Sequence, residues 1–555
     1  MPKSFFLVAA LIVLAACTSK EGSQSAGAPG GTMIFAAPSD AADIFPPFVS
    51  ETVGRFVQDQ IFDRLAEIDT ELTTVGDKGF SPRLAKSWTW ASDSLSIAFS
   101  IDPRARWHDG KSVTAADVRY SLKVFVDPKV GSPVAPTLTN LDSVSVRDSL
   151  TAVVWFKKHT PEQFYDVAYQ LIIMPEHVYG AIPAEQLHTS DAIRKLVGTG
   201  RFRLVRWDAG ARIELVSDTA NFRGRAKLDR VILIKTDPQT AAAQMLSGQA
   251  DFMEGFPIDQ VAKLDSNAVA RPLPVQLFAY TFMVMNVYAP KSKTQAHAIF
   301  SDRRVRHALS MAVDRVAMLH NFFGEHGRLG HGPFPMALPA ADSSIRVPPY
   351  DTVAAKALLD SAGWRVGPDG IRVKNGRPLH FSMISTTSSL PRRRYGVLLQ
   401  EAFRRIGAQV DFDILDPQAY TPRMFGGDFD ALLGSYNTDP SASGTKQNWG
   451  TAGIGENGQN WFRYSNAKVD ALLDSATAAF DPDASKAYSR RAFQAIADDY
   501  PAIWLYDLAP VHAVSRRFDL APIRSDEWWA NLADWSVPPT KRIDRDRIGL
   551  AQPKP

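Results

Sequence analysis

The sequence predicts an α/β protein made of two or more layered domains with mostly parallel sheets. Strand-like segments alternate with well-capped helices along the chain. A helix, a glycine stop and a strand also follow one another directly between Arg392 and Leu415. The 555 residues are more than a single core usually holds, so we expect a cleft at a domain junction, where ligands preferentially bind.

Capping residues mark the predicted helices. Thr114 to Asp117 is a capping box that opens a helix running through Val124. Asp302 begins a second helix, in which apolar residues recur at helical spacing until a stop near Gly324. The remaining predicted helices run from Asp351 to Gly363, from Arg392 to Ile406 with Gly407 as the stop, and from Asp481 to just before Pro501.

Three strands are predicted in the second half of the chain. Ala408 to Leu415 alternates in period two, Ala502 to Tyr506 is continuously apolar, and Phe429 to Leu433 is strand-like. Residues 435–440 should therefore lie at the carboxyl end of a strand, where open α/β sheets place their ligands.

The first 31 residues predict export. Lys3 gives a short positive region and Phe5 to Ala16 an apolar run that is too short to span a bilayer, as in a signal peptide of residues 1–16. The run ends in Leu14-Ala15-Ala16-Cys17, which resembles the lipobox of bacterial lipoproteins and implies that Cys17 is lipidated. The alternative is an ordinary cleaved signal with an incidental cysteine. Residues 17–31, rich in Ser, Gly and Ala, are predicted to be a flexible tether.

Composition excludes several classes of protein. Cys17 is the only cysteine, so no disulfide can form within the chain. The 62 Lys and Arg nearly balance the 59 Asp and Glu, so nothing suggests nucleic-acid binding. No segment after the signal has the length and apolarity of a membrane span. The body is expected to hang in water from a membrane surface.

Six motifs in a fixed order carry a family resemblance over roughly residues 32 to 540. They are Pro82-Arg-Leu-Ala-Lys-Ser-Trp88, Arg106-Trp-His-Asp-Gly110, Thr114-Ala-Ala-Asp-Val118, Val197-Gly-Thr-Gly-Arg-Phe202, Leu246-Ser-Gly-Gln-Ala-Asp251 and the Asp302 to Arg315 segment. In this order they resemble the family-5 extracellular solute-binding proteins, the oligopeptide- and dipeptide-binding proteins of bacterial ABC importers. The chain departs from the family pattern at Arg201, where proline is usual.

The resemblance implies the two-lobed type II periplasmic-binding-protein fold with an extra α/β domain. Lobe one would combine residues 32–60, 197–285 and 508–545, the extra domain would span 61–196, and lobe two 286–507. The implied function is that of a membrane-anchored protein that captures a peptide, or a polar organic solute of similar size, by lobe closure. Its partners would be the permease subunits of an ABC importer, and we expect a monomer in the periplasm or at the cell surface.

Several motifs could be interpreted as chemical sites, but a structural interpretation fits their residues better. His108 and Asp109 adjoin, but the Asp-Gly pair suits a turn ahead of the helix capped by Thr114. The glycines of Val197-Gly-Thr-Gly lack the third glycine of a dinucleotide fingerprint, which favours a hinge or tight turn. The histidines at 320, 326 and 331 match no standard metal spacing, so we expect no metal and no cofactor.

The segment from Gly434 to Tyr464 is the best candidate for contact with a ligand. Tyr436, Asn437, Thr438 and Asp439 lie near the predicted strand end, and Trp449, Trp461 and Phe462 follow in a loop rich in Gly and Asn. Aromatic residues in a polar loop suit stacking on an organic ligand. The alternative is a satellite cluster of the core beneath a long loop.

The resemblance adds further candidates. In peptide binders this region carries an aromatic residue and then an aspartate that pairs with the ligand's α-ammonium. Ser435 and Thr438 stand at those places here, while Asp439 comes one position later and could serve after a shift of the loop. On the facing lobe the family's ligand-contacting segment corresponds to Glu51, Thr52 and Val53, and Tyr280 and Asn286 flank the crossover into lobe two.

Two other functions stay open beside solute capture for import. A lipoprotein that senses a ligand or acts as a scaffold, without transport, would have the same sequence features. An exported hydrolase is disfavoured, because the sequence has no Gly-x-Ser-x-Gly elbow, no His-Glu-x-x-His, no P-loop and no cysteine left for nucleophilic work. We therefore expect no catalytic residues and no enzyme activity.

Overall fold

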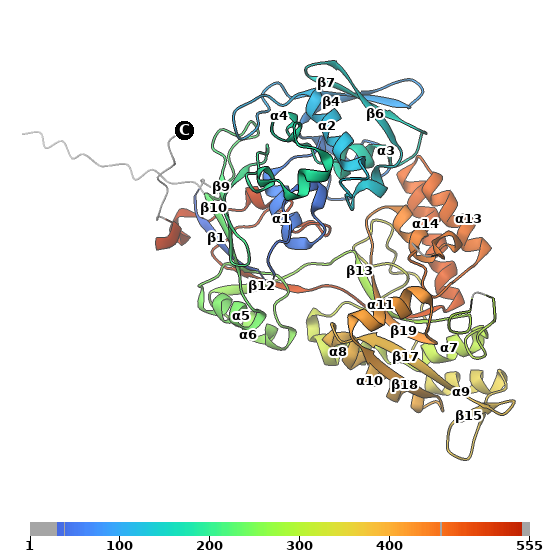
Figure 1. Ribbon diagram of the computed structural model, residues 1–555. Helices are drawn as coiled ribbons and strands as arrows, with labels where there is room; N and C mark the ends of the chain where they lie inside the picture. The colour runs from blue at the N-terminus through green and yellow to red at the C-terminus, as the bar shows by residue number, and fades with distance from the viewer. Residues whose placement is uncertain (1–29, 38, 293, 456–457, 547–555) are drawn as a thin grey trace, which may run out of the picture.

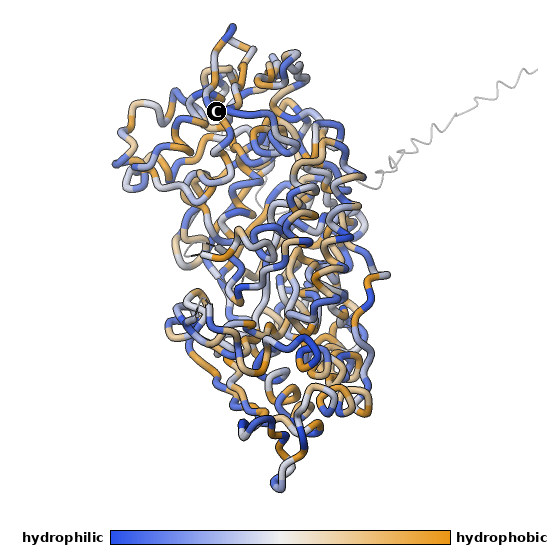
Figure 2. Tube along the Cα trace, turned by 90° about the vertical axis from the view of Figure 1, so that its right-hand side faces the viewer, coloured by the Kyte–Doolittle hydropathy of each residue, from blue (hydrophilic) through white to orange (hydrophobic). Residues whose placement is uncertain are grey.

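The computed structural model describes residues 30–37, 39–292, 294–455 and 458–546, which form two lobes joined by extended segments (Figure 1). The predicted signal peptide, Cys17 and most of the predicted tether lie outside the described residues. Within the described part of the chain no helix is long and apolar enough to cross a membrane. Figure 2 shows hydrophobic and hydrophilic residues interspersed along the coloured part of the trace.

Lobe one is built on a seven-stranded sheet with the order β12-β21-β11-β1-β10-β9-β8. The strands are β1 (Thr32–Ala37), β8 (Phe202–Asp208), β9 (Arg212–Ser217), β10 (Arg230–Lys235), β11 (Phe252–Met253), β12 (Ala270–Pro274) and β21 (Val511–Ser515). The helices are α1 (Thr52–Ile61), α5 (Pro238–Ser247) and α6 (Val261–Asp265). Segments from both ends of the chain therefore meet in one sheet.

The extra domain carries a four-stranded antiparallel sheet with the order β4-β5-β7-β6. Its strands are β2 (Ala66–Ile68), β3 (Phe80–Pro82), β4 (Ala85–Trp90), β5 (Ser96–Ile101), β6 (Leu141–Asp148) and β7 (Thr151–Phe156), and its helices are α2 (Ala115–Val126), α3 (Gln163–Tyr165) and α4 (Glu176–Tyr179). Helix α3 continues into a π-helical turn at Asp166–Gln170. One hydrophobic core runs from this domain into lobe one and also includes Phe334, Leu338 and Phe493 of lobe two.

Lobe two has a five-stranded sheet with the order β18-β17-β19-β13-β20. The strands are β13 (Ala279–Met285), β17 (His380–Thr386), β18 (Gln409–Leu415), β19 (Ala431–Asn437) and β20 (Ala502–Asp507), with a small sheet of β14 (Arg365–Val366), β15 (Arg372–Lys374) and β16 (Arg377–Pro378). Its helices are α7 (Arg303–Met311), α8 (Arg315–Phe323), α9 (Thr352–Ser361), α10 (Leu390–Arg404), α11 (Pro417–Gly426), α12 (Ala442–Trp449), α13 (Ala467–Ala478) and α14 (Pro482–Asp499).

Alternation along the central strand β13 gives lobe two a core on each face of its sheet. Phe282 and Val284 pack into one cluster with β19, β20 and helices α13 and α14. Met283 and Met285 pack into the opposite cluster with α7 and α10. A strand buried on both faces reads as a continuous apolar run rather than an alternating one, which is the pattern of β13.

Much of the predicted local structure is confirmed. The Thr114 capping box is present, Asp481 caps α14, and Gly407 adopts the left-handed conformation, with φ of 88°, between α10 and β18. The helix predicted from Asp302 to Gly324 is wrong in one respect. It breaks into α7 and α8 because Asp314 caps a new helix by accepting from the Ala317 backbone N–H.

The prediction of mostly parallel sheets is wrong. Among the described residues, the parallel pairs in lobe one are those of β1 with β10 and β11, and the parallel pairs in lobe two are those of β17 with β18 and β19. Other pairs come from hairpins or from strands that return from a distant part of the chain, which the helix-to-strand pattern does not reveal. Strand β13 belongs to the sheet of lobe two. The chain therefore crosses from lobe one to lobe two before Ala279, and not after Met285 as predicted.

Candidate ligand-binding cleft

A cleft of about 830 Å³ lies between the two lobes. One wall comes from α1, the π-helical turn of the extra domain and the C-terminal segment 525–529. The other wall comes from residues 437–440 at the end of β19. Both lobes therefore contribute to one hollow, whose size suits a small organic ligand.

The base of the cleft is a two-stranded ribbon formed where the chain crosses between the lobes. Leu277 N–H donates to Leu508 O at 3.0 Å, and Leu508 N–H donates to Ala279 O at 2.8 Å. The two crossings are hydrogen-bonded to each other, and the other bonds between the lobes include those of Ser443 to Glu162 and of His326 to Asp265. Such a ribbon is a suitable hinge, because small changes in a few backbone angles there turn one lobe relative to the other.

The lobe-one wall is rich in tryptophan. Trp528 stacks on Phe252 at 4.0 Å between ring centroids and on Phe56 of α1 at 5.3 Å, and its indole Nε1 donates to Glu254 Oε1 at 2.5 Å. Trp529 lies beside it, with its Nε1 bonded to Asp59 Oδ2 at 2.8 Å. These fixed rings give the cleft a rigid apolar face with polar groups at its edge.

An ion-pair network joins the C-terminal segment to the extra domain behind this wall. The buried guanidinium of Arg524 donates to Glu67, Asp526 and the Tyr169 hydroxyl, the last at 2.7 Å. Arg64 lies 4.4 Å from the centroid of the Tyr169 ring and pairs with Glu527 at 3.5 Å. Because these acids already have cationic partners, they are positioned to hold the wall together rather than to receive a ligand charge.

Asp439 stands on the lobe-two wall without a cationic partner in the described chain. Its Oδ1 accepts from the Ser441 backbone N–H at 2.8 Å, and its side chain is reachable by water from the cleft. The surrounding protein still limits hydration enough to raise the pKa of its carboxyl above the usual value. An unpaired carboxylate in a cleft is a suitable partner for a cationic group of a ligand.

Two carboxyl groups of the extra domain lie near Asp439. Glu162 accepts from Thr74 Oγ1 at 2.8 Å and, across the gap between lobes, from Ser443 Oγ at 2.9 Å. Burial, and then repulsion from Glu162 and Asp439, raises the pKa of Asp166 to about 8. Asp166 is therefore mostly protonated at neutral pH, so the negative charge beside Asp439 comes from Asp439 itself and Glu162.

Four of the residues predicted to contact a ligand line the cleft together, namely Thr52, Asn437, Thr438 and Asp439. Asn437 is the last residue of β19, so residues 435–437 lie within the strand and not after it.

The other predicted contacts on the first wall and at the crossover have structural roles. Glu51 caps α1 by accepting from the Gly54 backbone N–H at 2.9 Å, and Val53 is buried in the core. Asn286 is fully buried and donates to Gly427 O and Phe429 O, both at 3.2 Å. Tyr280 is buried beneath the cleft, where its hydroxyl accepts from Trp449.

The predicted aromatic contacts of lobe two belong to its core. Trp449 has no exposed surface, packs on Phe462 at 4.9 Å and donates from Nε1 to the Tyr280 hydroxyl at 2.8 Å. Tyr436 and Trp461 pack on each other at 4.6 Å in the same cluster. The loop folds back over one face of the sheet, as in the alternative of a satellite cluster, and the four rings do not line the cleft.

The histidines of these motifs make structural contacts. His108 accepts from Gly198 N–H through Nδ1 at 3.2 Å and bonds Gly200 O through Nε2 at 2.9 Å, so it ties two of the family motifs together. His326 pairs with Asp265 of lobe one at 3.3 Å. Across the described residues no group of three or more His, Cys, Asp or Glu is arranged to hold a metal ion.

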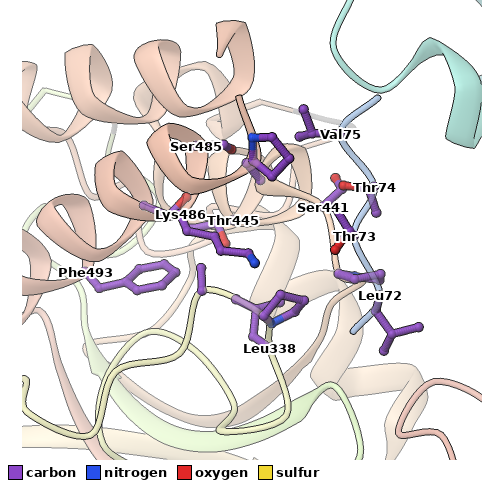
Figure 3. Close-up of a pocket in the computed structure, with 16 residues that line it drawn as sticks. Leu72, Thr73, Thr74, Val75, Leu338, Ser441, Thr445, Ser485, Lys486 and Phe493 are labelled. Atoms are coloured by element: carbon purple, nitrogen blue, oxygen red, sulfur yellow. The ribbon is translucent and has the colours of Figure 1, made fainter. Parts of the chain in front are cut away.

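A second, smaller contact joins the extra domain to lobe two away from the cleft. In Figure 3 the segment from Leu72 to Val75 faces Ser441, Thr445 and Lys486. Nearby, the His159 ring lies 4.3 Å from the Phe480 ring. These contacts and the bond from Ser443 to Glu162 bring the lobes together on one side of the cleft.

On the lobe-one side of the cleft, sequence reasoning found Thr52 and missed most of the other lining residues. Glu254, His512 and the segment Ser525-Asp-Glu-Trp-Trp529 all line it. Two adjacent tryptophans after two acids in a loop form the same kind of signal as the aromatics near Trp449, and this signal was available in the sequence. Glu254 and His512 come together only through the pairing of β11 with β21.

A two-lobed body with a hinge ribbon and a ligand-sized cleft defines the class of bacterial extracellular solute-binding proteins. The family model "Bacterial extracellular solute-binding proteins, family 5 Middle" matches residues 79–456, and the chain belongs to this family. The chain is 26% identical over 520 residues to the oligopeptide-binding protein AppA of Bacillus subtilis, covering 90% of this chain and 92% of AppA.

Two solved structures share the fold. The structure of AppA from Bacillus subtilis in complex with a nonapeptide has a TM-score of 0.71 at 22% identity and covers 92% of this chain and 99% of that chain. NikZ from Campylobacter jejuni in complex with Ni(L-His) has a TM-score of 0.71 at 22% identity, with 92% and 100% covered. The type II fold with an extra domain is therefore confirmed, and the ligands of such proteins differ widely.

Proposed function

We propose that this protein is the ligand-capturing component of an ABC importer and that it closes its two lobes around a peptide or a polar organic solute of similar size. The observation that carries the proposal is the 830 Å³ cleft between two lobes that are joined by a hydrogen-bonded ribbon. The family assignment and the nonapeptide complex of AppA support it.

The charges of the cleft favour a ligand with both an amine and a carboxylate. Asp439 offers a carboxylate on lobe two. Arg55, on α1 of lobe one, is exposed in the cleft and forms no ion pair with the described residues. A peptide would place its α-ammonium at Asp439 and a carboxylate toward Arg55, so that closure of the lobes pairs charges on both walls.

Anchoring and assembly complete the proposal. Lipid on Cys17 would hold the monomeric protein at a membrane, in the periplasm or at the cell surface, where it could deliver ligand to two permease subunits. A sensing or scaffold lipoprotein would use the same cleft without delivery. Loss of uptake of the ligand when the gene is deleted distinguishes import from those roles.

We further infer that the ligand leaves unchanged. The acids nearest the cleft are either paired with arginine or lack a neighbouring nucleophile and base arranged for proton transfer, which a hydrolase would require. Turnover of the bound compound at catalytic rates would overturn this inference.

The decisive experiment uses whatever ligand co-purifies. Mass spectrometry identifies it, and calorimetry then compares a peptide with its N-acetylated form. We expect the free amine to bind at least about tenfold more tightly, because acetylation removes the partner of Asp439. X-ray scattering should show a smaller radius of gyration with ligand. Failure of any peptide or co-purified solute to bind would refute the proposal.

A further inference from the structure

Glu254 is a second unpaired carboxyl group in the cleft, on the lobe opposite Asp439. It follows β11 directly, and its one polar partner in the described chain is the Trp528 indole, at 2.5 Å. No ion pair joins it to a described arginine, lysine or histidine, in contrast to Glu527 and Asp526 on the same wall. Burial raises the pKa of its carboxyl, and the indole bond only partly offsets this. A cationic partner would relieve this cost.

His512 lies beside Glu254 and carries an unpaired hydrogen-bond donor. Its Nδ1 accepts from the Gly255 backbone N–H at 3.0 Å, so a neutral ring must bear its proton on Nε2. Burial lowers the pKa of His512 to about 4, and the ring is therefore neutral at physiological pH. The residue is 3% exposed, lines the cleft, and its Nε2 has no partner among the described residues. Buried donors are rarely left unpaired without a functional reason.

The indole of Trp528 completes the site. It packs against the His512 ring at 6.3 Å between centroids and donates to Glu254, so its ring is fixed beside both groups. Phe252 and Phe56 stack on the indole and leave Trp528 only 3% exposed, so the ring borders the cleft with its edge. An apolar edge next to a carboxylate suits a long side chain with an apolar stem and a cationic tip. A polar uncharged side chain would leave the Glu254 charge without a partner.

We propose that Glu254, His512 and Trp528 form a subsite for a basic side chain, so that the captured solute is a peptide containing lysine or arginine. Glu254 binds the ammonium or guanidinium group, and His512 Nε2–H donates to a carbonyl oxygen of the peptide. The α-ammonium goes to Asp439 on the other wall. The proposal rests on the proposed function and adds the class of ligand.

The test is calorimetry with matched short peptides in which lysine or norleucine occupies each position in turn. At one position we expect the lysine peptide to bind about 10- to 100-fold more tightly than the norleucine peptide, because a hydrogen bond to a charged group usually contributes an affinity difference of this size. Glu254→Gln keeps a partner for the Trp528 indole but removes the charge. It should abolish the lysine preference and leave the norleucine peptide within about twofold of the wild type.

Two controls separate the roles. Glu185→Gln makes the same charge change at an exposed ion pair with Lys129, outside the cleft, and should leave every affinity unchanged. His512→Phe should weaken lysine and norleucine peptides equally, because it removes the donor to the backbone and not the partner of the side chain.

The outcomes are distinguishable. Equal affinity for lysine and norleucine at every position in the wild type overturns the subsite, whether or not the variants fold. A lysine preference that survives Glu254→Gln also overturns it. In both cases the peptides still bind, so the proposed function stands. If no peptide binds while another solute does, both are overturned.

Discussion

Replacement of Trp449 by alanine should destabilise lobe two and leave the ligand-binding cleft intact. The indole has no exposed surface and packs against Phe462, Trp504 and three other rings with centroid distances of 4.9 to 6.3 Å. Truncation of a buried tryptophan costs about 3–5 kcal/mol. Loss of the bond from Nε1 to the Tyr280 hydroxyl adds about 1 kcal/mol, because that buried hydroxyl loses its donor.

Urea unfolding of the ligand-free protein, followed by circular dichroism, measures this change. Trp449→Phe is the matched control, since it keeps a ring in the core and removes the indole N–H, and we expect a loss of about 1–2 kcal/mol. Calorimetry on both variants below their unfolding midpoints should give the wild-type affinity. An unchanged midpoint together with a large loss of affinity would refute the placement of Trp449 in the core.

Three further predictions follow from the cleft and the N-terminus. Asp439→Asn should weaken an amine ligand by about 2–5 kcal/mol, as measured by calorimetry, and leave its N-acetylated form unaffected; equal losses for both would contradict the pairing. Because the folded-state pKa of Asp166 is raised from 3.8 to about 8, its contribution to stability is lost as pH rises through this range. In thermal unfolding, the free energy of unfolding of Asp166→Asn should therefore exceed that of the wild type by about 1–3 kcal/mol at pH 8 and by almost nothing at pH 4. A stability difference between the two proteins that does not change with pH would contradict this prediction. Cys17→Ser should release the protein from the membrane fraction, and a wild type that incorporates no labelled fatty acid would exclude lipidation.

Local structure was predictable wherever a few neighbouring residues determine it. Caps such as Thr114 and Asp481 and the stop at Gly407 depend on backbone groups within one turn, so the sequence contains all the information needed. Strand pairing depends on contacts across hundreds of residues. The antiparallel pair of β11 with β21 joins Phe252 to Val514, and no local sequence pattern predicts this pairing.

The residues of the candidate site also divide into those that the local sequence predicts and those that it does not. Residues 437–439 were predictable because they stand at a strand end in one continuous segment, although the strand runs further than expected. The aromatics after it were assigned to a ligand because a polar loop gives no sign that it folds back over a core. Glu254 and His512 carry no sequence signal at all, since each is an isolated residue that becomes informative only when its neighbours and unpaired atoms are known.

The distribution of charge explains why closure would depend on the ligand. Carboxyl groups with no cationic partner among the described residues stand on both walls, Glu254 on lobe one and Asp439 on lobe two, and Glu162 lies near the latter. When the lobes turn about the ribbon at Leu277 and Leu508, these groups lose water, and an empty cleft has no cation to replace it. A dicationic peptide supplies one positive charge to each wall, so the free energy of closing becomes favourable only when the cleft is filled. Negative charge on both walls would thus keep the empty protein open and reserve the closed form, which a permease could distinguish, for the loaded protein.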